Sequence, residues 1–166
     1  SVGKGTQVDH LQVSYSNDDS YEWFGGNVNC RYIVALNGWD DEFDTDNGYS
    51  GNVQFALSIR DPRIADTSQS NGFESDNDAD GSLAEPTFIG PKGRNNFENT
   101  TDFINGGTMF PQNGSALGKF QSAMQIRRGS HLACFNSVAV GYPIGLIVDG
   151  EKGNTQEYAK QDKLKL

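Results

Sequence analysis

Hydrophobic and polar residues alternate along several short segments of the chain, a pattern typical of β-strands with one buried face. The alternation is strictest from Val53 to Ile59 and is also present from Val8 to Tyr15, whereas Tyr32 to Leu36 is a continuous apolar run. Further strands are predicted from Thr87 to Gly90, around Met124 and Ile126, from Leu132 to Phe135, around Val138 and Val140, and from Ile144 to Val148. No segment shows the period of an amphipathic helix. We therefore expect an all-β protein.

An acidic turn recurs between these strands. Asp18-Asp19-Ser20-Tyr21-Glu22 returns about 22 residues later as Asp40-Asp41-Glu42-Phe43-Asp44, and a third copy keeps the aromatic and acidic pair as Phe73-Glu74. A repeat of this length in sequence rich in Asn and Gly is typical of a solenoid, in which each copy forms one coil. We therefore expect Tyr21, Phe43 and Phe73 to stack inside, with the acidic residue of each pair pointing outward.

The repeat predicts one domain, because 166 residues are enough for one core and three copies can bury it. This single β-helix domain covers residues 1–166. Residues 91–119 show neither period and are rich in Asn, Gly and Thr, so we expect a long loop excursion there. Arg60 to Gln69, with Pro62 inside, is expected to be a shorter loop. The opening on Ser1 and the alternating residues 163–166 predict a fragment of a longer solenoid.

The charge of the chain limits its partners. A net charge of −9 opposes binding to nucleic acid or to an anionic membrane, because phosphates are recognised by clustered Lys and Arg. No run of 18 apolar residues is present, so no transmembrane segment is expected.

The two cysteines are Cys30 and Cys134. In a solenoid they lie three or four coils apart, about 14 to 19 Å at the strand spacing of about 4.8 Å. A disulfide needs Cα atoms within about 7 Å. We therefore favour two buried free thiols over one disulfide.

Several segments resemble a family of bacterial secreted and surface-lipoprotein proteins with a right-handed parallel β-helix fold. The resemblance is carried by residues 19–26, 40–46 and 70–78, together with Gln125-Ile126-Arg127-Arg128-Gly129-Ser130 and Gly141-Tyr142-Pro143-Ile144-Gly145-Leu146. It implies a pectin-lyase-like solenoid and a location outside the cell or on its outer surface. It implies no established activity.

A second resemblance is to calcium-dependent pectate lyases of the same fold. Some of them hold calcium on an Asp-Asp-x-x-Asp segment, and Asp40, Asp41 and Asp44 have that spacing. These lyases use an Arg or Lys near the calcium as base. Arg60 and Arg63 are the nearest candidates in the sequence.

Stacking of the acidic turns predicts a column of carboxylates. With coils in register, Asp19 lies over Asp41, and Glu22, Asp44 and Glu74 form a row with spacings of about 4.8 Å. Two carboxylates about 5 Å apart at an effective dielectric constant of about 20 repel by about 3 kcal/mol. Bound calcium relieves that repulsion, since it takes six to eight oxygen ligands. The alternative is that Asp, Asn and Gly only form exposed turns, with the repulsion screened by salt.

A second acidic segment supports the calcium hypothesis. Asp76, Asp78 and Asp80, followed by Gly81, copy the first half of an EF-hand loop, although Thr87 stands at the twelfth position and no helices flank it. The predicted metal ligands are Asp19, Glu22, Asp40, Asp41, Asp44, Asp46, Glu74, Asp76, Asp78 and Asp80.

Aromatic residues beside the acidic turns suggest a second kind of site. Trp23, Trp39 and Tyr49 could stack on a sugar ring, or could pack inside the corners of the coils. His10 and His131 lack Cys or His neighbours at zinc-binding spacing and are interpreted as structural.

Three functions therefore remain open. We favour a secreted or cell-surface, calcium-stabilised β-helix that acts as a binding or structural module, with polysaccharide or other surface proteins as partners. The alternatives are a calcium-dependent polysaccharide lyase that acts by β-elimination on a uronic-acid polymer, and a purely structural surface stalk.

Overall fold

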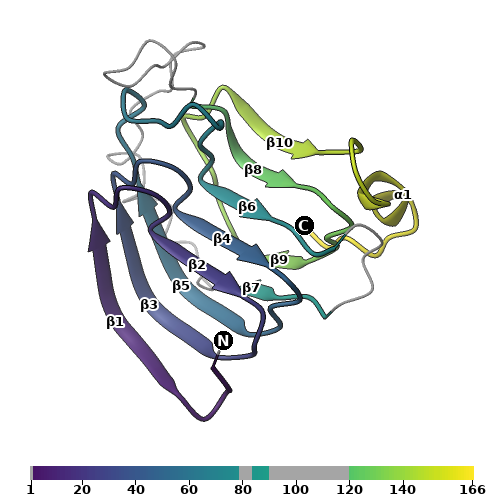
Figure 1. Cartoon of the computed structure of the whole chain (residues 1–166), viewed down its shortest axis with the longest axis horizontal. Helices are drawn as coiled ribbons and strands as arrows, with labels where there is room; N and C mark the ends of the chain where they lie inside the picture. The colour runs from purple at the N-terminus through teal and green to yellow at the C-terminus, as the bar shows by residue number, and fades with distance from the viewer. Residues whose placement is uncertain (1, 79–83, 90–119) are drawn as a thin grey trace.

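The chain folds as a parallel β-solenoid of five coils. The computed structural model describes residues 2–78, 84–89 and 120–166. These residues form two five-stranded sheets, in which each coil places one strand in each sheet (Figure 1). Sheet A has the order β1-β3-β5-β7-β9, sheet B has the order β10-β8-β6-β4-β2, and all neighbouring strands are parallel. The parallel β-helix predicted from the repeat is confirmed.

Most strands lie where the alternating and apolar segments predict them, but three lie on the repeated acidic copies, where the sequence predicts turns. Sheet A contains β1 (Gln7–Ser14), β3 (Asn29–Leu36), β5 (Asn52–Ile59), β7 (Thr87–Ile89) and β9 (Ala133–Phe135). Sheet B contains β2 (Tyr21–Phe24), β4 (Phe43–Asp46), β6 (Phe73–Ser75), β8 (Ser122–Ile126) and β10 (Ile144–Val148).

The predicted all-β class is confirmed, although the described residues include a short helix that the sequence analysis did not expect. Helix α1 (Thr155–Lys160) follows β10 and lies at the end of sheet B (Figure 1). Six residues are too few to display a helical period in the sequence, which explains the miss. In the parts of the chain that the structure describes, no helix has the length and hydropathy of a membrane span.

The three acidic copies occupy the same place in successive coils. Tyr21, Phe43 and Phe73 are register partners across β2, β4 and β6. The rings of Tyr21 and Phe43 stack with centroids 5.7 Å apart, and Phe43 and Phe73 are buried. The predicted internal aromatic row is therefore confirmed, and it fixes the register of the acidic residues that follow each ring.

Each long strand of sheet A turns a corner at one residue in the left-handed region. These residues are His10, Tyr32 and Phe55, with φ between 54° and 59°. In β3 the alternation resets at this point, because Cys30 and Ile33 are both buried with two exposed residues between them. The three rings point outward and stack, with centroids 4.7 and 4.9 Å apart. Aromatic residues are uncommon in this backbone region, so the corner could not be predicted from the residue types.

The two cysteines lie in one inward row of sheet A. Cys30, Val53, Phe88 and Cys134 are successive register partners, which places the thiols three coils apart. Both are free cysteines, as predicted, although Cys134 is only partly buried.

Two connections separate the expected strands. Residues 60–69 form the predicted loop between β5 and β6. Residues 136–143 contain no strand, so the strand expected around Val138 and Val140 is absent, and these side chains are 52% and 47% exposed. The pairing between β7 and β9 covers only Ala133–Phe135, which leaves this stretch without an adjoining strand among the described residues. The excursion predicted for residues 91–119 lies outside the described residues.

Inward residues of sheet A differ in burial, so we expect their substitution to reduce the free energy of unfolding by different amounts. Leu11 and Ile33 are register partners, but Leu11 in the terminal strand is 47% exposed and Ile33 is 0% exposed. We expect Ile33→Ala to reduce the free energy of unfolding by about 3 kcal/mol, because it leaves a cavity in the core. Leu11→Ala should cost less than about 1 kcal/mol. Urea denaturation of both variants tests this, and equal losses would contradict the stacking order.

Candidate metal centre

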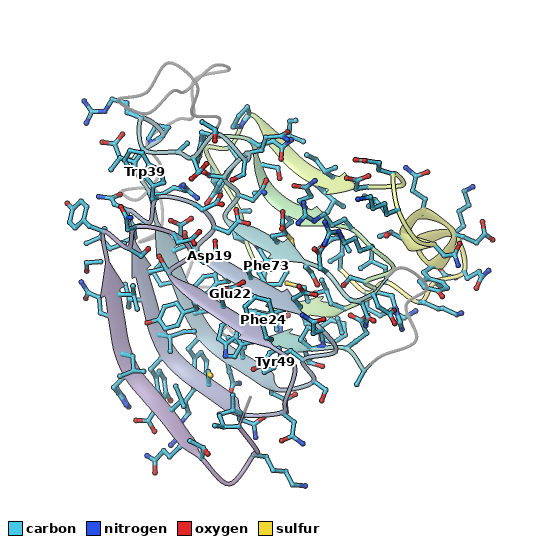
Figure 2. All side chains as sticks on the ribbon, in the orientation of Figure 1. Asp19, Glu22, Phe24, Trp39, Tyr49 and Phe73 are labelled. Carbon is cyan, nitrogen blue, oxygen red and sulfur yellow. The ribbon has the colours of Figure 1, made fainter. Side chains whose placement is uncertain are left out.

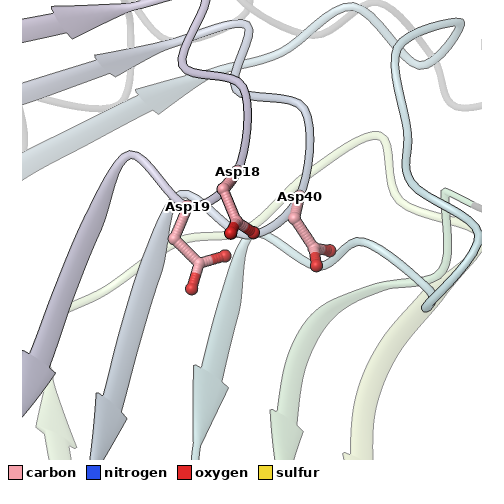
Figure 3. Close-up of side chains that lie close together, drawn as sticks. All are labelled: Asp18, Asp19 and Asp40. Carbon is pink, nitrogen blue, oxygen red and sulfur yellow. The ribbon is translucent and has the colours of Figure 1, made fainter.

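Acidic turns that precede β2 and β4 stack directly on one another. The backbone N–H of Asp41 donates to Oδ1 of Asp19 at 2.9 Å, so the two turns are joined side chain to backbone. Asp18, Asp19 and Asp40 come from these two turns and bring their carboxylates together (Figure 3). The predicted stacking of Asp19 on Asp41 therefore holds at the level of individual atoms.

The carboxylates form one continuous series, which we call the acidic column. Three groups each place their ligand oxygens within 4.8 Å of one another. The groups share Asp19 and Asp44, and each draws its members from two successive coils. The acidic column consists of Asp18, Asp19, Glu22, Asp40, Asp41, Asp44 and Glu74.

Exposure falls along the column from the first coil inward. Glu22, Asp44 and Glu74 are register partners on the outward face of sheet B. Glu22 is exposed, Asp44 is partly buried and Glu74 is 7% exposed. Glu74 therefore leaves the solenoid interior as predicted but does not reach free solvent. Asp41 is buried too, at 4% exposure.

Burial and mutual repulsion both disfavour the ionised carboxylates. Burial, with the neighbouring acidic groups, raises the pKa of Asp19 to about 7 and that of Asp44 to about 9. Burial also raises the pKa of Glu74 to about 8, although Arg127 acts in the opposite direction. The pKa of Asp41 is raised well above its usual range by burial and by Glu74. Without a cation, these carboxyl groups therefore stay protonated at pH values at which ordinary carboxyl groups are ionised.

One oxygen at the centre of the column has no hydrogen-bond partner. Oδ1 of Asp44 is buried and accepts no hydrogen bond from any described group. Buried polar atoms are almost always paired, since desolvation without a partner costs roughly 1–3 kcal/mol. Asp44 belongs to two of the three carboxylate groups, and a cation bound through Oδ1 would supply the missing partner. The donors in these groups are all oxygens, which suits calcium better than zinc.

An arginine forms ion pairs with carboxylates at one end of the column. Arg127, which follows β8, forms ion pairs with Glu74 at 2.6 Å and with Asp76 at 2.7 Å. Burial lowers the pKa of the Arg127 guanidinium, but its bonds to Asp76 and Glu74 outweigh that effect and raise it. This contact could not be predicted from the sequence, because 51 residues separate Arg127 from Asp76. Register pairing of β6 with β8 would have been needed to find it.

The remaining predicted ligands lie outside the three groups. Asp46 accepts a hydrogen bond from the backbone of Asn47, and Asp76 is paired with Arg127 and Arg128. Asp76 is therefore already neutralised by cations of the chain itself. Asp78 is partly buried and belongs to none of the groups found in the described residues. Asp80 and Gly81 lie outside the described residues, so the loop that resembles half an EF-hand stays a prediction.

Of the three aromatic residues considered for sugar binding, two pack inside the solenoid and one lies beside an acidic turn. Tyr49 is 1% exposed, donates a hydrogen bond to the carbonyl of Val28 at 2.8 Å, and stacks on Trp23 at 5.2 Å. Trp23 also stacks on Tyr21 and packs against the core. These two rings are held inside by corner packing, so they do not form the exposed stacking surface we considered. Trp39 is partly buried beside Asp40 and lies apart from Tyr49 (Figure 2).

The two arginines considered as a lyase base do not suit that role. Arg60 is 6% exposed and forms a buried ion pair with Glu42 at 2.7 Å. Its guanidinium also donates to backbone carbonyls of Gly38, Asp40, Ile64 and Asn71, so it holds the loop 60–69 to the corner. Arg63 is exposed and is paired with Asp61 at 2.5 Å. Arg60 therefore contacts the acidic turns in a structural role, because it holds the loop 60–69 to them.

Comparison with known proteins identifies one family. The family model described as "Pectate-lyase like beta helix domain" matches residues 1–166. No curated protein and no solved structure matches the chain.

The raised pKa values predict that the metal-free protein loses stability as the pH rises. The folded-state pKa of Asp19, about 7, and of Asp44, about 9, lie above the ordinary carboxylate value, so folding takes up protons. This contribution is fully present near pH 4 and is lost as the pH rises toward 9. Melting temperatures measured in chelator should fall over that range, and less steeply for Asp44→Asn. A melting temperature that rises from pH 5 to pH 9 would show that the column is ionised in the metal-free fold.

Proposed function

Because this chain belongs to the pectate-lyase-like β-helix family, we propose that it is a calcium-stabilised β-helix that serves as a binding module outside the cell or on its surface. The observation that carries the proposal is the buried, unpaired Oδ1 of Asp44 at the centre of the acidic column. A cation at this point supplies the missing partner. It also removes the repulsion among carboxylates that the stacking register forces together.

The chemistry of the donors supports calcium in particular. Calcium binds six to eight oxygens in a flexible arrangement, and carboxylates on turns can adapt to it. Magnesium demands a nearly ideal octahedron and keeps several waters, which suits a crowded, partly buried column less well. In the group of Asp19, Glu22 and Asp44, Glu22 is exposed, so an ion can enter there.

A bound ion would join successive coils. Asp19 and Glu22 belong to the first coil, Asp44 to the second and Glu74 to the third. An ion that shares ligands from two coils stabilises their stacking only in the folded state, because the unfolded chain does not hold these groups together. Calcium sites of low affinity are typical of extracellular modules. This supports the proposed location outside the cell.

Polysaccharide or another surface protein is the proposed partner of the module. The net charge of −9 opposes nucleic acid, and a parallel β-helix offers long, flat outer faces that repeat at each coil. A structural stalk uses the same fold and the same ion, but needs no ligand on those faces.

One observation bears on the lyase alternative. Arg127 lies at the end of the acidic column, where a base near bound calcium would be needed. A base for β-elimination must be neutral when it abstracts the proton. The two carboxylates that contact Arg127 raise its pKa and hold it charged. The contact therefore favours a role in neutralising Glu74 and Asp76, and we propose binding instead of catalysis.

Calcium should raise the melting temperature of the protein. At a calcium concentration about 100 times the dissociation constant, binding to the folded state contributes about 2.7 kcal/mol. For a domain of this size that corresponds to a rise of about 5 to 11 °C. Differential scanning calorimetry in chelator and in millimolar calcium measures it.

Matched variants separate the column from a general effect of charge. Asp44→Asn and Glu22→Gln remove column charges, whereas Glu151→Gln removes an exposed acidic charge after β10. The two column variants should lose most of the calcium-dependent rise, and Glu151→Gln should keep it. Equal rises in all three variants, or no rise in the unmodified protein, would contradict the calcium proposal.

We expect no lyase activity on polygalacturonate or alginate with calcium present. The assay is the ultraviolet absorbance of unsaturated products. An increase in absorbance that is lost in Arg127→Lys, but kept in Arg63→Lys, would replace the binding proposal by the lyase. Arg63→Lys is a suitable control because Arg63 is exposed and, among the described residues, its side chain bonds to Asp61.

A further inference from the structure

A polar groove lies on sheet A, away from the acidic column on sheet B. Its volume is about 450 Å³, and it crosses the first three strands of the sheet. The turn at residues 4–6 forms one side of it. The polar side chains that line it are those of Lys4, Thr6, Gln7, Asp9, Asn29, Arg31, Asn52 and Gln54.

The lining side chains form two rows along the solenoid axis. Gln7 and Asn29 are register partners, Asn52 bonds to Asn29, and the three form the first row. Asp9, Arg31 and Gln54 form the second row, two residues further along each strand. Within each row the groups repeat once per coil, about every 4.8 Å. This spacing is comparable with the length of one pyranose unit in an extended chain.

Contacts within and between the two rows hold these groups in place. Gln7 Nε2 donates to Asp9 at 2.7 Å, and Asn52 Nδ2 donates to Asn29 Oδ1 at 3.0 Å. Arg31 donates to Asp9 at 3.4 Å. A carboxamide offers two donors and an acceptor with two lone pairs, so one bond leaves further capacity toward a ligand. The rows therefore present both donors and acceptors, as hydroxyl groups require.

An aromatic stack lies beside the second row. His10, Tyr32 and Phe55 occupy the corner residues that follow Asp9, Arg31 and Gln54. The guanidinium carbon of Arg31 lies 5.8 Å from the centre of the Tyr32 ring, which links the polar rows to the stack. The side chain of His10 is 71% exposed, and Tyr32 is 43% exposed. The surface therefore combines polar side chains with the exposed rings of His10 and Tyr32.

We propose that this groove binds a neutral oligosaccharide that runs along the solenoid axis across β1, β3 and β5. The proposal deepens the binding role proposed above by giving it a site and a ligand class. Two cations and one anion line the groove, too few basic groups for a nucleic acid or a highly charged glycan. A peptide that adds to a sheet runs along a free strand edge, whereas this groove crosses three strands.

The test uses a glycan array that includes cellohexaose, mannohexaose, xylohexaose and hexagalacturonate, followed by calorimetric titration of the glycan that is retained. Two glutamines of β1 form a matched pair. Gln7 lines the groove, whereas Gln12 lies beyond the corner, and each is exposed and donates to a side chain two residues later. Gln7→Ala should weaken binding about fivefold, as the loss of one hydrogen bond predicts, and Gln12→Ala should leave it unchanged.

A second variant removes the ring without straining the corner. Tyr32→Asn keeps a residue that tolerates the left-handed region and should also weaken binding. Retention of no neutral glycan, retention of hexagalacturonate alone, or equal affinities for Gln7→Ala and Gln12→Ala would each overturn the proposal. Titration in chelator below the melting temperature separates this outcome from a failure of the calcium proposal, because no member of the acidic column lines the groove.

Discussion

Parallel stacking of coils in one fixed register is the constraint on which the rest of this structure depends. Each residue lies directly above its counterpart in the previous coil, so like residues are placed in contact about 4.8 Å apart. For Tyr21 and Phe43 this produces a favourable ring stack. For Glu22, Asp44 and Glu74 it produces repulsion that the fold cannot avoid without losing the aromatic row. The acidic column is therefore a consequence of the same register that builds the core.

Among the described residues, cationic side chains relieve this repulsion at one end of the column. Arg127 and Arg128 neutralise Asp76, and Arg127 also pairs with Glu74. Toward the first coil, the described contacts of Asp19, Glu22 and Asp44 include no ion pair. Proton uptake and cation binding are the two remaining ways to stabilise this part, and they compete. Calcium would displace the protons, which explains why the pH dependence and the metal dependence of stability are coupled in our account.

The fold and the acidic column could be predicted from sequence because both follow from short-range repeats. The offset from Tyr21-Glu22 to Phe43-Asp44 gives the register directly, and Phe73-Glu74 extends it. Arg127 could not be placed in the same way, since the residues between β7 and β8 interrupt the repeat. The burial of Arg60 with Glu42 was also missed, because a charged pair inside a corner has no periodic signal. Similarly, the corner at His10, Tyr32 and Phe55 depends on backbone angles that aromatic residues rarely adopt.

The most direct measurement is the anomalous X-ray scattering of crystals grown in calcium. Our account predicts an anomalous peak in the acidic column, about 2.3 to 2.6 Å from Oδ1 of Asp44, with carboxylates of at least two coils as ligands. Clear density for the carboxylates with no peak between them, and with Oδ1 of Asp44 bonded to a water or to a protonated neighbour, would contradict the claim that a cation holds these coils together.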